Sequence, residues 1–291
     1  MTRNTESIKG IAMLDRMSIG VVALLAALLT AIAGAPAQDV SRYPDWSGQW
    51  KKPNGVGNQW DLSRPPGRGQ RPPLTLEYQA IYEARLADRA AGGLGGNFTA
   101  QCVPHGVPQM MTGIYPMEVV VTPKTTYILS EYNEPRRIFT DGRDWPKEIE
   151  GTFNGYSIGK WIDENRDGRY NVLEVETRGF KRPRNFDQQG IPLHEDSQSI
   201  VKERFYLDKA DKDLLHLEIT TIDHALTEPW SVAKIFRREP DPIWMFVDCS
   251  EDNHHVWVGK DDYFVSYDGY LMPTKKNQQP PDLRYFNRTQ K

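Results

Sequence analysis

Short β-type runs dominate the chain from Glu118 onward and constrain its fold more than any other feature. Nine runs rich in β-branched and aromatic residues follow one another, with turn residues between them and little helical periodicity. They cover Glu118–Thr122, Thr126–Tyr132, Arg137–Thr140, Tyr156–Ile162, Tyr170–Thr177, Ile200–Leu207, Leu214–Ile222, Trp230–Arg237 and Trp244–Val247. Strands in succession with little helix between them favour antiparallel pairing. The sequence therefore predicts a mainly β protein with an antiparallel β domain over residues 98–258.

Alternation within one run indicates that the sheet has a buried face. Leu215, Leu217 and Ile219 are separated by polar residues, which gives this strand one apolar and one solvated side. The turn residues Asp208–Asp213 join it to the preceding run as a hairpin. A sheet of this many strands must hide its edges. We therefore predict an up-and-down antiparallel barrel, or a strongly curled sheet, with an interior.

The segment before the strands, residues 38–97, reads as an extended stretch followed by one helix. Proline, glycine and arginine are frequent up to Pro73, which favours an irregular path over the surface. Thr75 is suited to cap a helix, and Tyr78, Tyr82 and Leu86 recur at four-residue spacing. These features predict a helix near residues 76–90, packed outside the barrel. Residues 259–291 are expected to form a C-terminal extension whose last part is disordered.

The N-terminus has the layout of a secretory signal peptide over residues 1–37. Lys9 and Arg16 precede an apolar run from Val21 to Ala33, and Ala35-Pro36-Ala37 offers small residues for cleavage before Gln38. The alternative, an uncleaved membrane anchor, would need about 20 apolar residues, more than this run contains. We therefore expect a periplasmic or secreted protein without stable membrane insertion after cleavage. Its formal charge of −3 gives no basis for a nucleic-acid partner.

Cys102 and Cys249 are the two cysteines of the chain. An exported protein meets oxidising conditions, so the pair predicts one long-range disulfide. An alternative interpretation joins both cysteines with His105, His254 and His255 as ligands of a zinc ion. Their spacing matches no standard zinc module.

Residues 163–174 fit the pattern of a twelve-residue calcium loop, D-x-[DN]-x-[DN]-G-x₅-E. The predicted calcium ligands are Asp163, Asn165, Asp167, the backbone carbonyl of Arg169, and Glu174. The flanking runs are β-type, whereas an EF-hand has helices there. The alternative is a polar hairpin turn that binds nothing, because turns prefer the same residue types.

Two segments offer residues for acid–base chemistry. They are His194-Glu195-Asp196 and Asp223-His224, in which a carboxylate neighbours a histidine that titrates near neutral pH. With Arg136 to stabilise developing negative charge, we take His194, Asp223, His224 and Arg136 as the candidate catalytic set. The alternative is a surface or structural role for each histidine. Gly155–Gly159 matches G-x-S-x-G, but a nucleophile elbow needs a helix after it, and none is expected here.

Two resemblances add to this interpretation. Gly48-Gln49-Trp50 resembles the G-x-W signature of lipocalin-like barrels, whose tryptophan closes the barrel base beneath an arginine from a late strand. Arg237 or Arg238 would be that arginine here. From Asp45 to about Arg238 the chain resembles a family of uncharacterised exported bacterial proteins. The resemblance is carried by Tyr115–Glu118, Arg136–Arg143, Gly155–Trp161 and Pro229-Trp230, and it implies no particular activity.

Three hypotheses on function follow. The first is a barrel that binds an apolar or aromatic small molecule, since a closed sheet lined with aromatic residues forms an apolar pocket. The second is an isomerase, lyase or hydrolase with a histidine acid or base and an arginine in the barrel cavity. The third is a structural or partner-binding envelope protein. Convergence of His194, His224, Arg136 and Asp223 in one cavity would favour the enzyme.

Overall fold

The computed structural model describes residues 40–53, 71–132, 134–245, 249, 254–266 and 269–281. The predicted signal peptide over residues 1–37 lies outside the described residues. So do much of the proline-rich segment, Asn133, and the tail from residue 282, for which disorder was expected. None of the described helices is long and apolar enough to cross a membrane.

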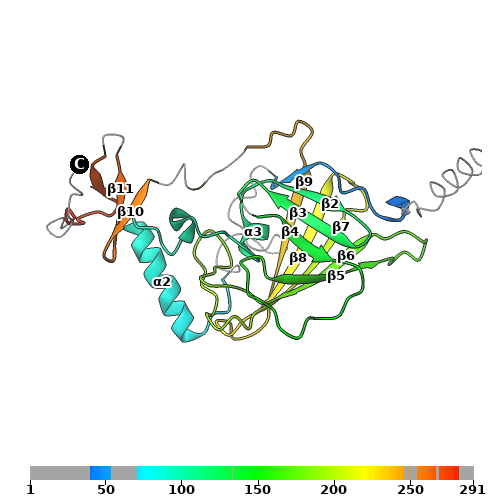
Figure 1. The fold of residues 1–291 in the computed structure, drawn as a ribbon, viewed down its shortest axis with the longest axis horizontal. Helices are drawn as coiled ribbons and strands as arrows, with labels where there is room; N and C mark the ends of the chain where they lie inside the picture. Colours follow the sequence, from blue (N-terminus) through cyan, green and yellow to red (C-terminus); the bar gives the residue numbers. More distant parts are fainter. Residues whose placement is uncertain are drawn as a thin grey trace, which may run out of the picture. The chain divides into compact units, whose positions relative to one another are not determined.

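Nine strands form a closed barrel in which each strand pairs with the next (Figure 1). They are β1 (Gln49–Lys51), β2 (Met117–Val121), β3 (Thr125–Ser130), β4 (Arg136–Phe139), β5 (Tyr156–Ile162), β6 (Val172–Arg178), β7 (Ile200–Leu207), β8 (Leu214–Ile222) and β9 (Trp230–Arg238). The last strand returns to the first, with Trp50 opposite Arg238. The predicted mainly β fold with a closed barrel is therefore confirmed.

Beyond small shifts in strand bounds, three differences from the predicted barrel strands stand out. β1 was not predicted, because its three residues lie beside a proline-rich stretch and show no alternation of their own. Trp244 and Met245 are not in a strand, and the other two residues of that predicted run are not described. β4 and β5 pair in parallel, with Ile138 opposite Ser157. Residues 140–155 supply the long connection that a parallel pair requires.

Side chains at alternate strand positions fill the inside of the barrel. Apolar residues predominate, and all of the following are buried: Met117, Val119, Ile128, Ile138, Trp161, Leu173, Val175, Val201, Phe205, Leu215, Leu217, Ile219, Val232 and Phe236. A barrel of about this size either is filled by side chains or holds one small ligand. Here the inward side chains are at most 8% exposed. The interior is therefore a packed core.

Aromatic residues close both ends of the barrel. At the end that carries the connections 163–171 and 208–213, called here the β5–β6 end, the ring of Trp46 lies 4.8 Å from that of Trp161 and 6.1 Å from that of Phe205. At the opposite end, called the β6–β7 end, connections 179–199 and 223–229 cover the barrel. Phe186 packs there against Trp230, with ring centroids 4.3 Å apart.

Arg238 is the arginine that covers Trp50. Its guanidinium lies 4.5 Å from the centre of a ring of Trp50 and donates hydrogen bonds to the carbonyl oxygens of Asp45 and Ser47. Arg237 instead pairs with Asp211 on the surface. A planar guanidinium suits this role because it stacks on a ring while its N–H groups bond to carbonyls. This contact fixes the segment before β1 against the end of β9.

A buried ion pair lies among the apolar side chains of the barrel. Arg136 and Glu203 form two charge-assisted hydrogen bonds, and their side chains are at most 1% exposed. Ser157 and Thr177 lie within hydrogen-bond distance of the same guanidinium. Because its donors are engaged by these three side chains, Arg136 is part of the core.

Glu203→Gln tests the importance of this buried pair. The change keeps the shape of the side chain but leaves the charge of Arg136 uncompensated, and we expect a loss of about 3 to 5 kcal/mol in the free energy of unfolding. Urea unfolding measures it. Asp211→Asn, which removes the exposed partner of Arg237, serves as the control and should leave the urea midpoint unchanged. Equal midpoints for all three proteins would show that the buried pair does not stabilise the barrel.

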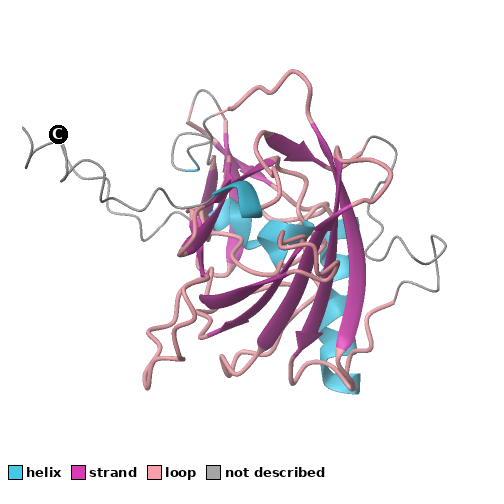
Figure 2. Ribbon diagram, turned by 90° about the vertical axis from the view of Figure 1, so that its right-hand side faces the viewer, coloured by secondary structure: helices cyan, strands magenta, loops and turns pink. Residues whose placement is uncertain are grey.

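Helix α2 (Leu76–Ala90) lies outside the barrel, as predicted (Figure 2). Thr75 caps the helix by accepting a hydrogen bond from the backbone N–H of Tyr78. The buried residues of the helix are Tyr78 and Tyr82. Two short helices follow, η3 (Phe98–Gln101) and α3 (Gln109–Thr112). A third, η1 (Val40–Arg42), precedes β1.

A second, three-stranded sheet follows the barrel in the chain. It consists of β10 (His255–Val258), β11 (Asp261–Val265) and β12 (Leu271–Pro273), so much of the predicted C-terminal extension is ordered. The chain just after β12 contacts α2, since Lys275 pairs with Asp88. Cys102 and Cys249 lie at disulfide distance, with Cα atoms 5.5 Å apart. The predicted disulfide is therefore present, and the alternative zinc set, which needs free thiolates, is not.

His105 is buried three residues after Cys102. Its ring stacks on Tyr132 at 4.5 Å, and its Nε2 lies 2.9 Å from the hydroxyl of Thr99. Burial lowers the pKa of His105 to about 4. In the unfolded chain a histidine takes up a proton near pH 6.5. The free energy of unfolding is therefore highest above that pH and decreases as the pH falls toward 4.

His105→Phe tests this dependence. The wild type should lose up to about 3 kcal/mol between pH 6.5 and 4 through this group, and the variant, which keeps the ring but cannot bind a proton, should lose correspondingly less. Thermal unfolding at a series of pH values gives both curves. Parallel curves would mean that His105 takes up its proton as readily in the folded protein as in the unfolded one.

Candidate metal centre

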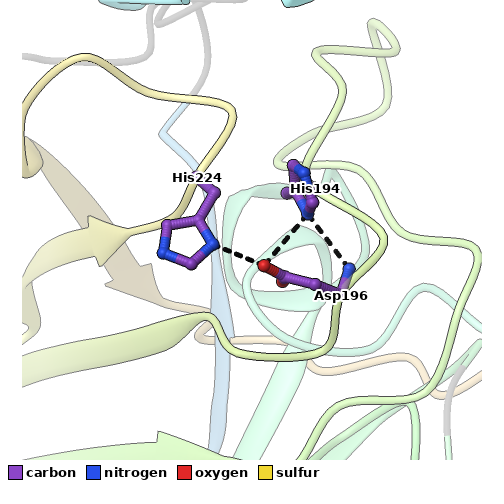
Figure 3. A group of neighbouring side chains, drawn as sticks. All are labelled: His194, Asp196 and His224. Atoms are coloured by element: carbon purple, nitrogen blue, oxygen red, sulfur yellow. Dashed lines mark hydrogen bonds and ion pairs between the residues drawn. The ribbon is translucent and has the colours of Figure 1, made fainter.

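Three side chains from two connections meet at the β6–β7 end of the barrel (Figure 3). His194 and Asp196 belong to the connection that enters β7, and His224 follows β8. β7 and β8 are paired with Ile200 opposite Ile222, so the chain before one strand lies beside the chain after the other. The sheet register therefore brings together residues that are about thirty positions apart in the sequence.

These three residues direct nitrogen and oxygen atoms toward one another. One ring nitrogen of each histidine and one carboxylate oxygen of Asp196 all lie within 4.8 Å of one another. Oδ2 of Asp196 is 3.1 Å from Nδ1 of His194 and is in closer contact with Nδ1 of His224. We call this group the His194–Asp196–His224 cluster.

The contacts of His194 place two electron-rich atoms opposite each other, its own Nδ1 and Oδ2 of Asp196. Its Nδ1 lies 3.1 Å from the backbone nitrogen of Asp196 and also 3.1 Å from Oδ2 of the same residue. A ring nitrogen that accepts a hydrogen bond from N–H has no proton to donate to a carboxylate. A proton or a cation between these atoms would remove the repulsion.

Hydrogen bonds hold Asp196 in its ionised form. Burial raises the pKa of this carboxyl, but the hydrogen bond from the backbone N–H of Gln198 and the bond with His224 contribute to a net lowering below its ordinary value. The carboxylate is therefore available as an anionic ligand at neutral pH.

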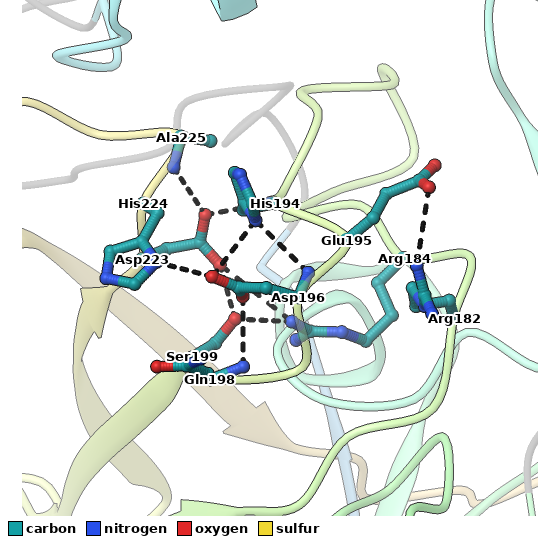
Figure 4. Close-up of polar contacts among 10 residues, drawn as sticks. All are labelled: Arg182, Arg184, His194, Glu195, Asp196, Gln198, Ser199, Asp223, His224 and Ala225. Atoms are coloured by element: carbon teal, nitrogen blue, oxygen red, sulfur yellow. Dashed lines mark hydrogen bonds and ion pairs between the residues drawn. The ribbon is translucent and has the colours of Figure 1, made fainter.

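Asp223 fixes the backbone on both sides of the cluster (Figure 4). Its Oδ1 accepts hydrogen bonds from the backbone nitrogens of His194 and Ala225, both at 2.8 Å. Its Oδ2 accepts from the hydroxyl of Ser199. One buried carboxylate thus joins the connection that carries His194 to the turn that carries His224.

Arg184 supplies the positive charge beneath this carboxylate. Its Nη2 lies 3.8 Å from Oδ2 of Asp223 and donates to the hydroxyl of Ser199, and its guanidinium lies 4.2 Å from the ring centre of Phe180. Burial lowers the pKa of Arg184 to about 10, against the effect of Asp223 and Asp196. The side chain is 1% exposed and stays charged at neutral pH. Arg184 and Asp223 therefore form a buried pair that supports the cluster from within.

The structure brings together three of the four predicted catalytic residues. His194, His224 and Asp223 lie in this site, whereas Arg136 is bonded to Glu203 inside the barrel. The residues outside the predicted catalytic set are Asp196, Arg184 and Ser199. The His-x-Asp spacing of residues 194–196 was a usable signal for Asp196, but Arg184 and Ser199 are ordinary loop residues in the sequence.

The predicted calcium ligands are not assembled in the same way. Asp163 accepts hydrogen bonds from the backbone nitrogens of Asp167 and Gly168, and Asp167 accepts one from that of Arg169. Glu174 lies within β6, where it is exposed and paired in register with Lys160 and Arg204. Among the described residues, Asp163, Asp167 and Glu174 do not form a cluster of metal-ligand spacing. Calcium binding by residues 163–174, including Asn165, stays a prediction.

A cleft of about 1410 Å³ lies at the β5–β6 end. Tyr170 and Tyr206 line it, but Arg42 covers the ring of Tyr170, and the ring of Tyr206 stacks on His216 with Arg204 near it. Both rings are therefore already engaged in contacts within the protein. The cleft therefore gives less indication of a ligand class than the cluster does.

Fold and site define a β-barrel protein with a His-Asp-His cluster at one end of the barrel. No family model, no curated protein and no solved structure matches this chain.

Asp223→Asn tests the support of the cluster. The change leaves the charge of Arg184 without its buried partner, and we expect a loss of about 3 to 5 kcal/mol in the free energy of unfolding. Urea unfolding measures it. The control is Asp208→Asn, which changes a half-buried carboxylate that also bonds backbone nitrogens and a histidine, His216. A smaller loss for Asp223→Asn than for Asp208→Asn would contradict this role.

Proposed function

We propose that this protein is an exported β-barrel protein that binds a divalent transition-metal ion through His194, Asp196 and His224. The convergence of two imidazole nitrogens and one carboxylate oxygen within 4.8 Å carries the proposal. Imidazole and carboxylate together suit zinc, and this combination of ligands recurs in zinc sites that act on substrates. Export is supported by the signal-like N-terminus and by the disulfide.

The spacing of the ligand atoms favours this interpretation. Atoms bound to zinc at about 2.1 Å in a tetrahedron lie roughly 3.4 Å from one another. The 3.1 Å between Oδ2 of Asp196 and Nδ1 of His194 is close to that value. For an ion to bind, the closer contact of Asp196 with His224 would have to widen, and Nδ1 of His194 would have to release the hydrogen bond that it accepts from the backbone N–H of Asp196.

The surroundings of the cluster also favour a metal. Side chains bind a metal ion more tightly when neighbouring groups hold them in position. Asp223 holds the backbone of His194 and of the turn after His224, and Gln198 donates a hydrogen bond to Asp196. The proposed ligands are therefore oriented before any ion arrives.

The other predicted functions have less support from the described residues. Binding of an apolar molecule inside the barrel would require displacing the side chains that fill it. Acid–base catalysis by His194 or His224 would use the same cluster, but without Arg136. Metal titration separates this alternative from the proposal, because a purely acid–base pair of histidines takes up no ion.

Zinc titration of the metal-free protein tests the proposal. Calorimetry should show one equivalent bound by the wild type, and His224→Ala should weaken binding at least about 100-fold, more than the loss of an outer partner costs. His216→Ala is the matched control, because His216 also pairs with a carboxylate, that of Asp208, yet belongs to no group of three with metal-ligand spacing in the described part of the chain. Its affinity for zinc should equal that of the wild type.

Two results would contradict the proposal. One is the absence of zinc uptake by the folded wild type. The other is binding that His224→Ala and His216→Ala weaken equally, which would place the ion elsewhere. Circular dichroism of each variant confirms that the barrel is intact before the titration.

A further inference from the structure

We infer that the metal ion at the His194–Asp196–His224 cluster keeps a coordination position open to solvent, at which it binds small anions that donate oxygen or nitrogen. This inference rests on the proposed metal site. It concerns the role of the ion. A structural zinc ion is enclosed by four protein ligands, whereas a zinc ion that acts on a substrate keeps one coordination position free.

The described part of the chain supplies three ligands and no fourth at this cluster. Among the described residues, His194, Asp196 and His224 are the group with metal-ligand spacing. The neighbouring Asp223 is not available, because its side chain is fully buried and both its oxygens accept hydrogen bonds. A zinc ion with four ligands would therefore take its fourth from solution.

Glu195, the other nearby carboxylate, is turned away from the cluster. Its side chain is 72% exposed and lies 3.7 Å from Arg182, on the side of the connection that faces away from His224 (Figure 4). The backbone between His194 and Asp196 places Glu195 on the opposite side from its neighbours. It is therefore not positioned to close the shell.

The cluster is open on the side of His224. The side chain of His224 is 65% exposed, and that of His194 is 33% exposed. Asp223 and Arg184 lie beneath the cluster and are almost fully buried. The free position of the ion would thus point to solvent, and the buried pair would support the opposite side.

The charges indicate the class of ligand. A divalent ion with one carboxylate and two neutral imidazoles leaves a net positive charge at the site, and the charge of Arg184 is balanced by Asp223. A bound cation of this kind is the largest local charge. Small anions, such as carboxylates or azide, are therefore favoured over neutral molecules.

Cobalt(II) in place of zinc makes the coordination shell visible. The full-length protein is loaded with cobalt, and its visible absorption spectrum is recorded while sodium azide is added. We expect a saturable change in the wild type and in His216→Ala, because azide enters the open position. Sodium chloride at the same ionic strength corrects for the effect of salt on the protein.

The outcomes separate the two proposals. If cobalt binds and azide changes the spectrum saturably, the open position is supported. If cobalt binds in the wild type but not in His224→Ala, and azide leaves the spectrum unchanged, the metal site stands and the open position is overturned. If the wild type takes up no cobalt, the proposed function fails, and this inference fails with it.

Discussion

Closure of the barrel, by the pairing of β9 with β1, decides where chemistry can take place in this protein. Because the sheet has no free edge, its inner side chains pack against one another, and aromatic residues such as Trp46 and Phe186 close the two ends. A packed interior excludes solvent and substrates. Function is therefore expected in the connections at the ends of the barrel, where polar side chains meet without disturbing the core.

Two buried ion pairs illustrate this division. Arg136 and Glu203 satisfy each other inside the barrel, with two hydroxyl groups nearby, and offer nothing to a ligand. Arg184 and Asp223 lie under the connections instead, and Asp223 uses its hydrogen bonds to position the backbone of His194. The same chemical pair thus stabilises the fold in one place and shapes the candidate site in the other.

Much of the fold could be predicted from the sequence, because alternation and turn residues act locally. β7 and β8 have the predicted bounds, and α2 begins at the predicted cap. β1 was missed because its three residues pair only where the barrel closes, and the parallel pairing of β4 with β5 was missed because the sequence of residues 140–155 does not reveal that they cross over. The site was predicted in part. Histidines beside carboxylates mark it in the sequence. The register of β7 and β8 shows that Asp196 joins them, and the ion pair with Glu203 shows that Arg136 does not.

X-ray absorption spectroscopy of the zinc-loaded protein tests the central claim most directly, because it reports which atoms surround the ion. The account predicts two imidazole nitrogens and one or more oxygens at about 2.0 to 2.2 Å, with no sulfur. His224→Ala, loaded at high zinc concentration, should show one imidazole fewer. A shell made only of oxygens, or one that is unchanged in the variant, would contradict the assignment of the ion to His194, Asp196 and His224.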